Sequence, residues 1–296
     1  MMGDSILLTG ATGFIGSHVA RRLVADGWQV HAVVRDPAAV LPEGVAGLVH
    51  DGTTAGMTDL MHKASPRVVV HLASLFLAQH CPADIVPLLQ SNVVFGAQLA
   101  EAMQVTGVRH LVNAGTSWQY FHSEKYRPVC LYAATKEAFE ALLRFYVDSA
   151  GLQVITLKLF DTYGPGDPRP KLMHLLKNAA REKTALSMSP GEQLIDLVYI
   201  DDVVDAFLVA ITRLLAGVVG GMEEYGVSSG APLTLRALAE RFSKISNLPL
   251  AIDWGGRPYR PREVMTPWQD YRLLPGWKPK VDIDQGIAAF LDKTQS

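Results

Sequence analysis

The fold is decided by two adjacent stretches of the sequence, SILLT at Ser5–Thr9 and GATGFIG at Gly10–Gly16. The first is a short apolar run that predicts a buried strand, and the second leads directly into a helical pattern. Gly10 permits a tight turn, Gly13 lets the backbone approach a pyrophosphate, and Gly16 lets the helix pack closely on the strand. Unpaired N–H groups at the start of that helix attract phosphate. The two stretches therefore predict a strand–loop–helix unit that binds a dinucleotide.

The same alternation of short apolar runs and longer amphipathic segments continues through the first half of the chain. Strands that are apolar throughout and separated by helices predict an α/β fold with a Rossmann-type, doubly wound parallel sheet. In such sheets ligands bind at the carboxyl ends of the strands. Further strands are expected at Gln29–Val34, Gly47–His50, Arg67–Leu72, Arg109–Asn113 and Gln153–Leu159, and helices at Phe14–Asp26, Ala55–Lys63, Ile85–Gln104 and Tyr132–Ala150.

The composition and the segment lengths of the sequence change past the middle of the chain, where a loop rich in Gly and Pro is followed by shorter segments. This change predicts an NADP(H)-binding domain over residues 1–165 and a smaller C-terminal substrate-binding lobe over most of residues 166–296. The run LIDLVYI at residues 194–200 again has the pattern of a buried strand, and Asp201–Leu215 has that of a helix. We therefore expect the first domain to receive residues from about 192–220 as well.

The end of the second expected strand bears on which dinucleotide is bound. An acid at this place binds the ribose 2′-hydroxyl of NAD, whereas an arginine suits the 2′-phosphate of NADP. Arg35 comes first here and Asp36 second, and a planar guanidinium can hold a phosphate through two hydrogen bonds. We therefore expect NADP(H) as the cofactor, while Asp36 leaves NAD(H) open. Asp51 and Gly52, after the third strand, either lie near the adenine or form an ordinary turn.

Tyr132 and Lys136, in the run YAATK, lie four residues apart on an expected helix and so share one face of it. A free tyrosine has a pKa near ~10 and is a poor acid–base group at neutral pH. A nearby ammonium group favours the phenolate and lowers that pKa toward the working range. A hydroxyl cluster, Gly115-Thr116-Ser117, follows the fifth strand at its carboxyl end. Together with the dinucleotide loop, these residues predict acid–base chemistry beside a redox cofactor.

Short motifs follow one another along the chain. They are GATGFIG (10–16), HLAS (71–74), Asn92 with Val93, Thr116, YAATK (132–136), LFDTYGPG (159–166), LVYIDDV (197–203) and LPGWKP (274–279). With them the sequence resembles the extended short-chain dehydrogenase/reductase family, and within it the group of nucleotide-sugar epimerases, dehydratases and reductases. The motifs occur in the family's order over nearly the whole chain, and the set is specific although no single motif is.

The resemblance implies a seven-stranded Rossmann domain and a C-terminal lobe that binds a nucleoside-diphosphate sugar. It implies that Tyr132 is the acid–base residue, that Lys136 holds the nicotinamide ribose and tunes Tyr132, and that Thr116 hydrogen-bonds the reacting sugar oxygen. It places Asn92 behind the site and makes Arg260 a phosphate-binding residue. The residues expected to bind the cofactor are Gly10, Thr12, Gly13, Phe14, Ile15, Gly16, Arg35, Asp51, Gly52, Leu72, Ala73, Ser74, Asn92, Tyr132 and Lys136. Those expected to bind the substrate are Thr116, Ser117, Trp118, Asp161 and Arg260.

One departure from the group's pattern bears on the reaction. Dehydratases of the group carry Thr-Asp-Glu where this chain has Thr116-Ser117-Trp118, and neither Ser nor Trp can transfer protons as a carboxylate does. The segments GTSWQ and LKLFDTYG resemble instead the abequose and paratose synthase branch, which reduces CDP- or dTDP-linked 4-keto-6-deoxyhexoses. We therefore expect an NADP-dependent 4-ketoreductase. Two alternatives stay open: an epimerase that retains NAD, and a non-catalytic NADP(H)-binding regulatory protein.

The amino-acid composition limits the classes of partner that we expect the protein to bind. The 296 residues carry 27 Lys and Arg against 29 Asp and Glu, and this formal net charge of −2 argues against a nucleic-acid binder. No apolar stretch reaches the ~18 residues of a membrane span, and we expect no secretory signal. Two cysteines fit a reducing cytoplasm, and nine scattered histidines predict no metal site. The apolar helices at Ile85–Gln104 and Tyr132–Ala150 fit either a homodimer, which the resemblance implies, or core packing.

Overall fold

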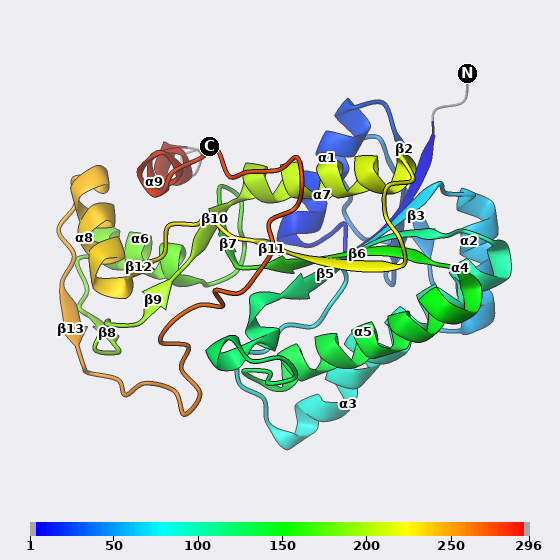
Figure 1. Cartoon of the computed structure of the whole chain (residues 1–296). Coiled ribbons are helices and arrows are strands. Elements are labelled where there is room, and N and C mark those ends of the chain that lie inside the picture. Colours follow the sequence, from blue (N-terminus) through cyan, green and yellow to red (C-terminus); the bar gives the residue numbers. More distant parts are fainter. Residues whose placement is uncertain (1–3, 293–296) are drawn as a thin grey trace.

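The computed structural model describes residues 4–292, so the outermost residues of the expected ranges 1–165 and 166–296 lie outside it. Its main strands are β1 Ser5–Thr9, β2 Gln29–Val34, β3 Val45–Val49, β4 Val68–His71, β5 His110–Thr116, β6 Gln153–Leu159 and β11 Met222–Val227. They form one parallel seven-stranded sheet in the order β11-β6-β5-β4-β1-β2-β3 (Figure 1). The order runs outward in both directions from β1 and β4, which confirms the expected doubly wound, Rossmann-type sheet.

Helices cover both faces of this sheet. They are α1 Phe14–Ala25, α2 Thr54–Ala64, α3 Ile85–Leu89, α4 Phe95–Thr106, α5 Leu131–Ala150 and α7 Ile200–Leu215. Side chains of successive residues in a strand point to opposite faces. Ile6 and Leu8 therefore join one core with α1 and α7, whereas Leu7 joins a second core with α2, α4 and α5. The two sets of helices lie on opposite sides of the sheet (Figure 1). Burial on both sides explains why the strands are apolar at nearly every position.

The helix expected at Ile85–Gln104 is not continuous. A turn of π-helix at Gln90–Val94 separates α3 from α4. This wider turn carries Asn92, whose amide accepts from the backbone N of Leu75 at 2.7 Å and donates to the Thr135 hydroxyl at 2.9 Å. The Asn92 side chain thus ties the loop after β4 to the second turn of α5. Single π turns occur often near functional sites.

The smaller lobe is built from short elements. They are β7 Asp161–Tyr163, α6 Leu172–Glu182, β8 Leu186–Met188, β9 Leu194–Ile195, β10 Leu197–Tyr199, β12 Leu233–Thr234, α8 Leu235–Ser246, β13 Ile252–Trp254 and α9 Ile283–Asp292. The strands pair two by two, β10 with β7, β12 with β9 and β13 with β8, and none joins the large sheet. Short 3₁₀ turns lie at Pro82–Asp84, Ser117–Gln119 and Phe121–Ser123.

The run LIDLVYI forms two strands rather than the single buried strand expected at residues 194–200. Its first two residues, β9, pair antiparallel with β12, and Leu197–Tyr199, β10, pair in parallel with β7, while Ile200 begins α7. Asp196 separates the two strands and accepts hydrogen bonds from the Ser228 hydroxyl at 2.6 Å and the Ser229 backbone N at 2.8 Å. The seventh strand of the large sheet is β11 instead, which begins just after the expected 192–220 segment. Helix α7 of that segment does pack on β5 and β6.

Surface features of residues 4–292 bear on the expected partners. No helix in this range is both long enough and apolar enough to cross a membrane. No group of three His, Cys, Asp or Glu side chains in the same range is placed to hold a metal ion. Several apolar side chains of α3, α4 and α5 are exposed, including Val86 at 73% and Phe145 at 62%. The expected homodimer would cover such side chains, and it stays a prediction.

Candidate active site

The glycine-rich loop is packed too tightly for any larger residue at two of its positions. Gly10 has a φ of +79°, and a Cβ on it would lie 2.7 Å from the backbone N of Ala73. A Cβ on Gly16 would lie 2.0 Å from the carbonyl oxygen of Gly10. Gly13 is exposed and caps α1 without a side-chain hydrogen bond, so the first N–H groups of the helix remain available to a ligand. The tight turn expected at Gly10 and the close packing expected at Gly16 are thus present, and the binding of a pyrophosphate by this loop stays a prediction.

A buried hydrogen-bond chain holds the loop after β4 against Gly10. The Thr9 hydroxyl accepts from the backbone N atoms of Leu72 at 3.2 Å and Ala73 at 3.1 Å. It therefore donates its own hydrogen to Nδ1 of His71 at 2.8 Å. Burial, and secondarily Lys136, lower the pKa of His71 to about 3, so this imidazole is neutral at working pH. Thr9 and His71 thus place the expected residues Leu72 and Ala73 beside the dinucleotide loop.

The charged residues after β2 and β3 differ in the hydrogen bonds that they make. Asp36 Oδ1 accepts from the backbone N of Ala38 at 2.8 Å, and Asp51 Oδ1 accepts from both the backbone N and the hydroxyl of Thr53 at 2.8 Å. The Thr53 hydrogen bonds hold the pKa of Asp51 below its usual range. Arg35 is exposed at the end of β2. Both acids thus accept hydrogen bonds in local turns through one oxygen and keep the other, whereas the Arg35 guanidinium makes no hydrogen bond or ion pair within residues 4–292.

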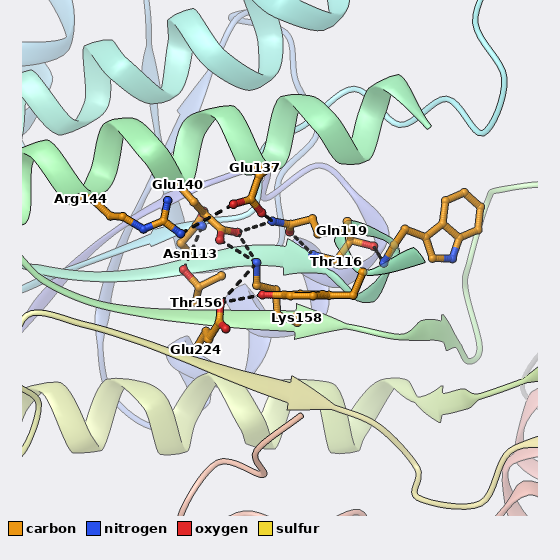
Figure 2. A network of polar contacts seen from close by, with 11 residues as sticks. Asn113, Thr116, Gln119, Glu137, Glu140, Arg144, Thr156, Lys158 and Glu224 are labelled. Carbon is orange, nitrogen blue, oxygen red and sulfur yellow. Dashed lines mark hydrogen bonds and ion pairs between the residues drawn. The ribbon is translucent and has the colours of Figure 1, made fainter. Parts of the chain in front are cut away.

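Strand β5 continues to Thr116, three residues beyond the expected end at Asn113. The Thr116 hydroxyl accepts from the backbone N of Trp118 at 3.3 Å, and Gln119 Oε1 accepts from the Thr116 backbone N at 3.0 Å (Figure 2). Thr116 and Gln119 form a capping box on the short turn that follows the strand, in which each side chain accepts from the backbone of the other residue. The Thr116 hydroxyl is an acceptor there and keeps its own hydrogen, which it can donate to a substrate oxygen.

Tyr132 and Lys136 lie on the first two turns of α5 and are both buried. Burial raises the pKa of Tyr132 to about 12, against the opposing effects of the Ser74 hydroxyl and Arg169. Burial lowers the pKa of Lys136 to about 8. The structure contradicts the expected charge effect: the pKa of Tyr132 is raised rather than lowered, and the groups that favour its phenolate are Ser74 and Arg169 instead of Lys136. Tyr132 is therefore protonated at neutral pH, and Lys136 is mostly cationic.

Two adjoining cavities bring most of the expected site residues together. A cleft of about 240 Å³ runs from the glycine loop to α5, and a cavity of about 440 Å³ lies between the large sheet and the smaller lobe. Expected residues that line the cleft are Gly10, Gly13, Phe14, Ile15, Gly16, Leu72, Ser74, Thr116, Ser117, Trp118, Tyr132, Lys136 and Asp161. Arg260 lines the larger cavity only, whereas Thr12, Arg35, Asp51, Gly52, Ala73 and Asn92 line neither. Ser117, Trp118 and Asp161 line both, so the two spaces meet beside the catalytic candidates.

Comparison with known proteins identifies the family of this chain. The family model for the NAD dependent epimerase/dehydratase family matches residues 6–224. The chain belongs to this family. CDP-abequose synthase of Salmonella typhimurium is 23% identical over 98% of this chain and 98% of its own length. UDP-glucose 4-epimerase of Mycolicibacterium smegmatis is 30% identical over 95% of this chain and 96% of its own.

A solved structure in the epimerase/dehydratase family has the same fold. The crystal structure of UDP-glucose 4-epimerase from Thermus thermophilus, in complex with NAD, superimposes with a TM-score of 0.83. It is 25% identical in sequence, and the match covers 98% of this chain and 99% of that one. The similar proteins thus include a synthase and epimerases by name, and all of these matches span nearly the full chain.

The basic residues of the larger cavity are not all free to bind a phosphate. Arg260 donates from Nε and Nη2 to the Glu263 carboxylate at 3.0 and 2.7 Å, and its guanidinium lies 5.4 Å from the Trp118 ring centre. Lys171 Nζ lies 3.9 Å from Asp161 Oδ1, and burial lowers the pKa of Lys171. In this member of the epimerase/dehydratase family, Glu263 thus neutralises part of the Arg260 charge, and the phosphate-binding role of Arg260 stays a prediction.

Phe76 is a site residue that the sequence motifs did not identify. Its ring is 43% exposed, lines both cavities, and meets the Tyr132 ring edge-on with the centroids 4.9 Å apart. The Trp118 ring lies 5.8 Å from it. Phe76 belongs to the apolar run SLFLA, which has the pattern of core sequence, and only its position two residues after the HLAS motif pointed toward the cofactor.

Proposed function

We propose that this protein reduces the keto group of a nucleoside-diphosphate-linked 4-keto-6-deoxyhexose with NADPH. The observation that carries the proposal is the convergence of Thr116, Tyr132 and Lys136 where the dinucleotide cleft meets the larger cavity. The glycine loop would hold the dinucleotide pyrophosphate, and Arg35 its 2′-phosphate. When bound, the nicotinamide supplies a hydride to the carbonyl carbon of the sugar.

Tyr132 would then donate its phenolic proton to the carbonyl oxygen, and Thr116 would donate a hydrogen bond to the same oxygen. The raised pKa of Tyr132, about 12, keeps that proton in place at neutral pH, which suits a reduction. The Ser74 hydroxyl and Arg169 would stabilise the phenolate that forms until solvent returns the proton, and the Lys136 ammonium would hold the nicotinamide ribose. No carboxylate stands at Ser117 or Trp118, so the elimination of water by a dehydratase has no acid there.

The division of the chain supports the same proposal. The sheet domain, residues 1–165 with about 192–220 and β11, would hold NADP(H), and most of residues 166–296 would hold the nucleotide sugar. The larger cavity between them has room for a sugar and offers Arg260 and Lys171 to a diphosphate. A second copy of the chain on the apolar side chains of α3 and α5 would complete a homodimer.

The function is tested with a panel of CDP-, dTDP-, GDP- and UDP-linked 4-keto-6-deoxyhexoses, each assayed with NADPH and NADH at the nicotinamide absorbance. Oxidation of NADPH that depends on one of these ketosugars is the expected result. A panel without any such oxidation would refute the reductase. An NAD-retaining epimerase is the second candidate, because a UDP-glucose 4-epimerase is 30% identical to the chain. Purified protein that carries stoichiometric nicotinamide and interconverts UDP-hexoses would establish that candidate instead.

Replacing Arg35 by alanine is expected to raise the KM for NADPH by roughly 10–100-fold, because a hydrogen bond to a charged group contributes about 1.5–3 kcal/mol. The KM for NADH should hardly change, since NADH has no 2′-phosphate. Initial rates with each coenzyme measure the effect. Arg181→Ala, an exposed arginine in the last turn of α6, is the matched control. An unaltered preference between the two coenzymes in Arg35→Ala would argue against NADP(H).

Replacing Phe76 by serine is expected to weaken the preference for a 6-deoxy sugar over its 6-hydroxy counterpart by about 10-fold or more. The Phe76 and Trp118 rings give the cavity an aromatic wall beside Tyr132, and such a wall favours a methyl group over a hydroxyl. The ratio of kcat/KM values for the two sugars measures this. Phe76→Leu, which keeps the wall apolar, should retain the preference. Equal ratios in the serine variant and the original protein would show that the wall does not select the sugar.

A further inference from the structure

A fully buried ion pair lies directly behind the site (Figure 2). Lys158 on β6 donates from Nζ to both carboxylate oxygens of Glu140 on α5, at 2.8 and 2.6 Å, and both side chains are 0% exposed. Removing two charges from water costs free energy that their attraction often does not recover, so such a pair is weak evidence for stability. Neither residue touches the two cavities, and the proposed chemistry does not use them directly.

Glu140 is connected to Thr116 through a single side chain. Gln119 Nε2 donates to Glu140 Oε1 at 3.0 Å and to Glu137 Oε2 at 2.7 Å (Figure 2). Because two carboxylates hold the amide nitrogen, the amide oxygen must face the other way, where it accepts from the Thr116 backbone N at 3.0 Å. The end of β5 is thereby anchored to α5, the helix that carries Tyr132 and Lys136.

Glu140 is also connected to Lys136, which lies one helical turn earlier on the same face of α5. The Glu140 carboxylate raises the pKa of Lys136, and the Lys158 ammonium lowers it by a smaller amount. The negative member of the ion pair thus has the stronger effect on Lys136. Among the other titratable groups, neutral His71 on β4 interacts with Lys136, and Tyr132, Asp161, Arg169 and Lys171 line the same cleft as Lys136. Glu137 on α5 and Glu224 on β11 interact with the ion pair itself.

We propose that Glu140 is a positioning residue for the reaction, which holds Thr116 in place through Gln119 and keeps Lys136 cationic. This inference rests on the proposed function for the roles of Thr116 and Lys136. Lys158 neutralises the Glu140 charge that would otherwise stand alone in the core. The buried pair is therefore maintained for the alignment and charge of two catalytic groups on two different elements.

The charge effect is tested on the binding of NADPH alone, so that it does not depend on knowing the sugar. Affinity for NADPH is measured by nicotinamide fluorescence from pH 6 to 10. Loss of the Lys136 charge should weaken binding at about pH 8, and this fall in affinity forms the alkaline limb of the pH profile. In Glu140→Gln this limb should move to lower pH by at least about one unit. In the doubly neutral variant Glu140→Gln/Lys158→Met it should move in the same direction by less. Lys136→Met, which has no charge to lose, should show no limb.

The structural alternative makes a different prediction. If the pair only stabilises the fold, Glu140→Gln lowers the melting temperature without moving the pH limb, and the limb stays in place in the double variant as well. An unmoved limb in folded Glu140→Gln would therefore overturn the proposal. Failure of NADPH to bind the unaltered protein would instead refute the proposed function, so the two failures are distinguishable.

The alignment effect is tested with Gln119→Met, which removes the link to Thr116 and leaves Glu140 and Lys136 in place. We expect kcat for ketosugar reduction to fall by about 10-fold or more, with the pH limb of NADPH binding unchanged. The melting temperature of each variant shows whether it is folded. An unchanged kcat in folded Gln119→Met would overturn this part of the proposal.

Discussion

Replacing Tyr132 by phenylalanine is expected to lower kcat for ketosugar reduction by about 10²–10⁴-fold, the usual contribution of a positioned acid. The phenol is buried at the junction of the two cavities, and its raised pKa keeps it protonated at neutral pH. Phenylalanine keeps the ring, and with it the edge-on contact to Phe76, but has no proton to donate. Affinity for NADPH should change by only a few-fold, because the glycine loop is untouched. Steady-state kinetics and a fluorescence titration measure the two quantities.

The matched control for this variant is Tyr146→Phe. Tyr146 lies on the same helix, and its hydroxyl donates to Glu101 at 2.9 Å rather than lining either cavity. Loss of that hydroxyl should leave kcat nearly unchanged. Full turnover by Tyr132→Phe would refute the assignment of Tyr132 as the proton donor.

Replacing Gly16 by alanine is expected to weaken dinucleotide binding by about 100-fold or more and to lower the free energy of unfolding by roughly 1–3 kcal/mol. The added Cβ would lie 2.0 Å from the Gly10 carbonyl oxygen, which is backbone and cannot swing aside. Either α1 must move away from β1 or the loop must open, and both displace the N–H groups that face the pyrophosphate. Thermal unfolding and NADPH titration measure the two effects.

Gly220→Ala is the matched control for the Gly16 variant. A Cβ at Gly220 would meet no atom within 4 Å, and its φ is not in the left-handed region. The same chemical change should therefore leave both stability and binding nearly unaltered. Normal NADPH affinity in Gly16→Ala would show that the close approach of α1 to the loop is not needed for binding.

The strands and helices that sequence patterns located best are those with sharp local boundaries. β1, β2 and β6 occupy the residues expected for them, because each is an apolar run between polar or glycine-containing segments. β3, expected at Gly47–His50, lies at Val45–Val49. It is an edge strand with mostly exposed side chains, so pairing with β2 sets its bounds rather than its own composition.

Two other differences between the expected and the observed elements also depend on contacts with distant parts of the chain. The π turn at Gln90–Val94 leaves the periodicity of the expected helix nearly intact, so only the contacts of Asn92 reveal it. LIDLVYI is apolar enough for one buried strand, but its two halves pair with different partners from distant parts of the chain. Such pairing is non-local, and no local pattern contains it.

The sequence by itself determined the dinucleotide loop, the sheet class and the Tyr132–Lys136 pair, because each depends on residues within a few positions of one another. A glycine turn and a spacing of four on a helix keep the same geometry wherever they occur. Only the tertiary structure decided that Phe76 would face Tyr132, that Arg260 would lie 5.4 Å from the Trp118 ring centre, and that Glu140 would join Lys158. These contacts link residues on separate elements or through buried space, where packing and desolvation, rather than local conformation, choose the partners.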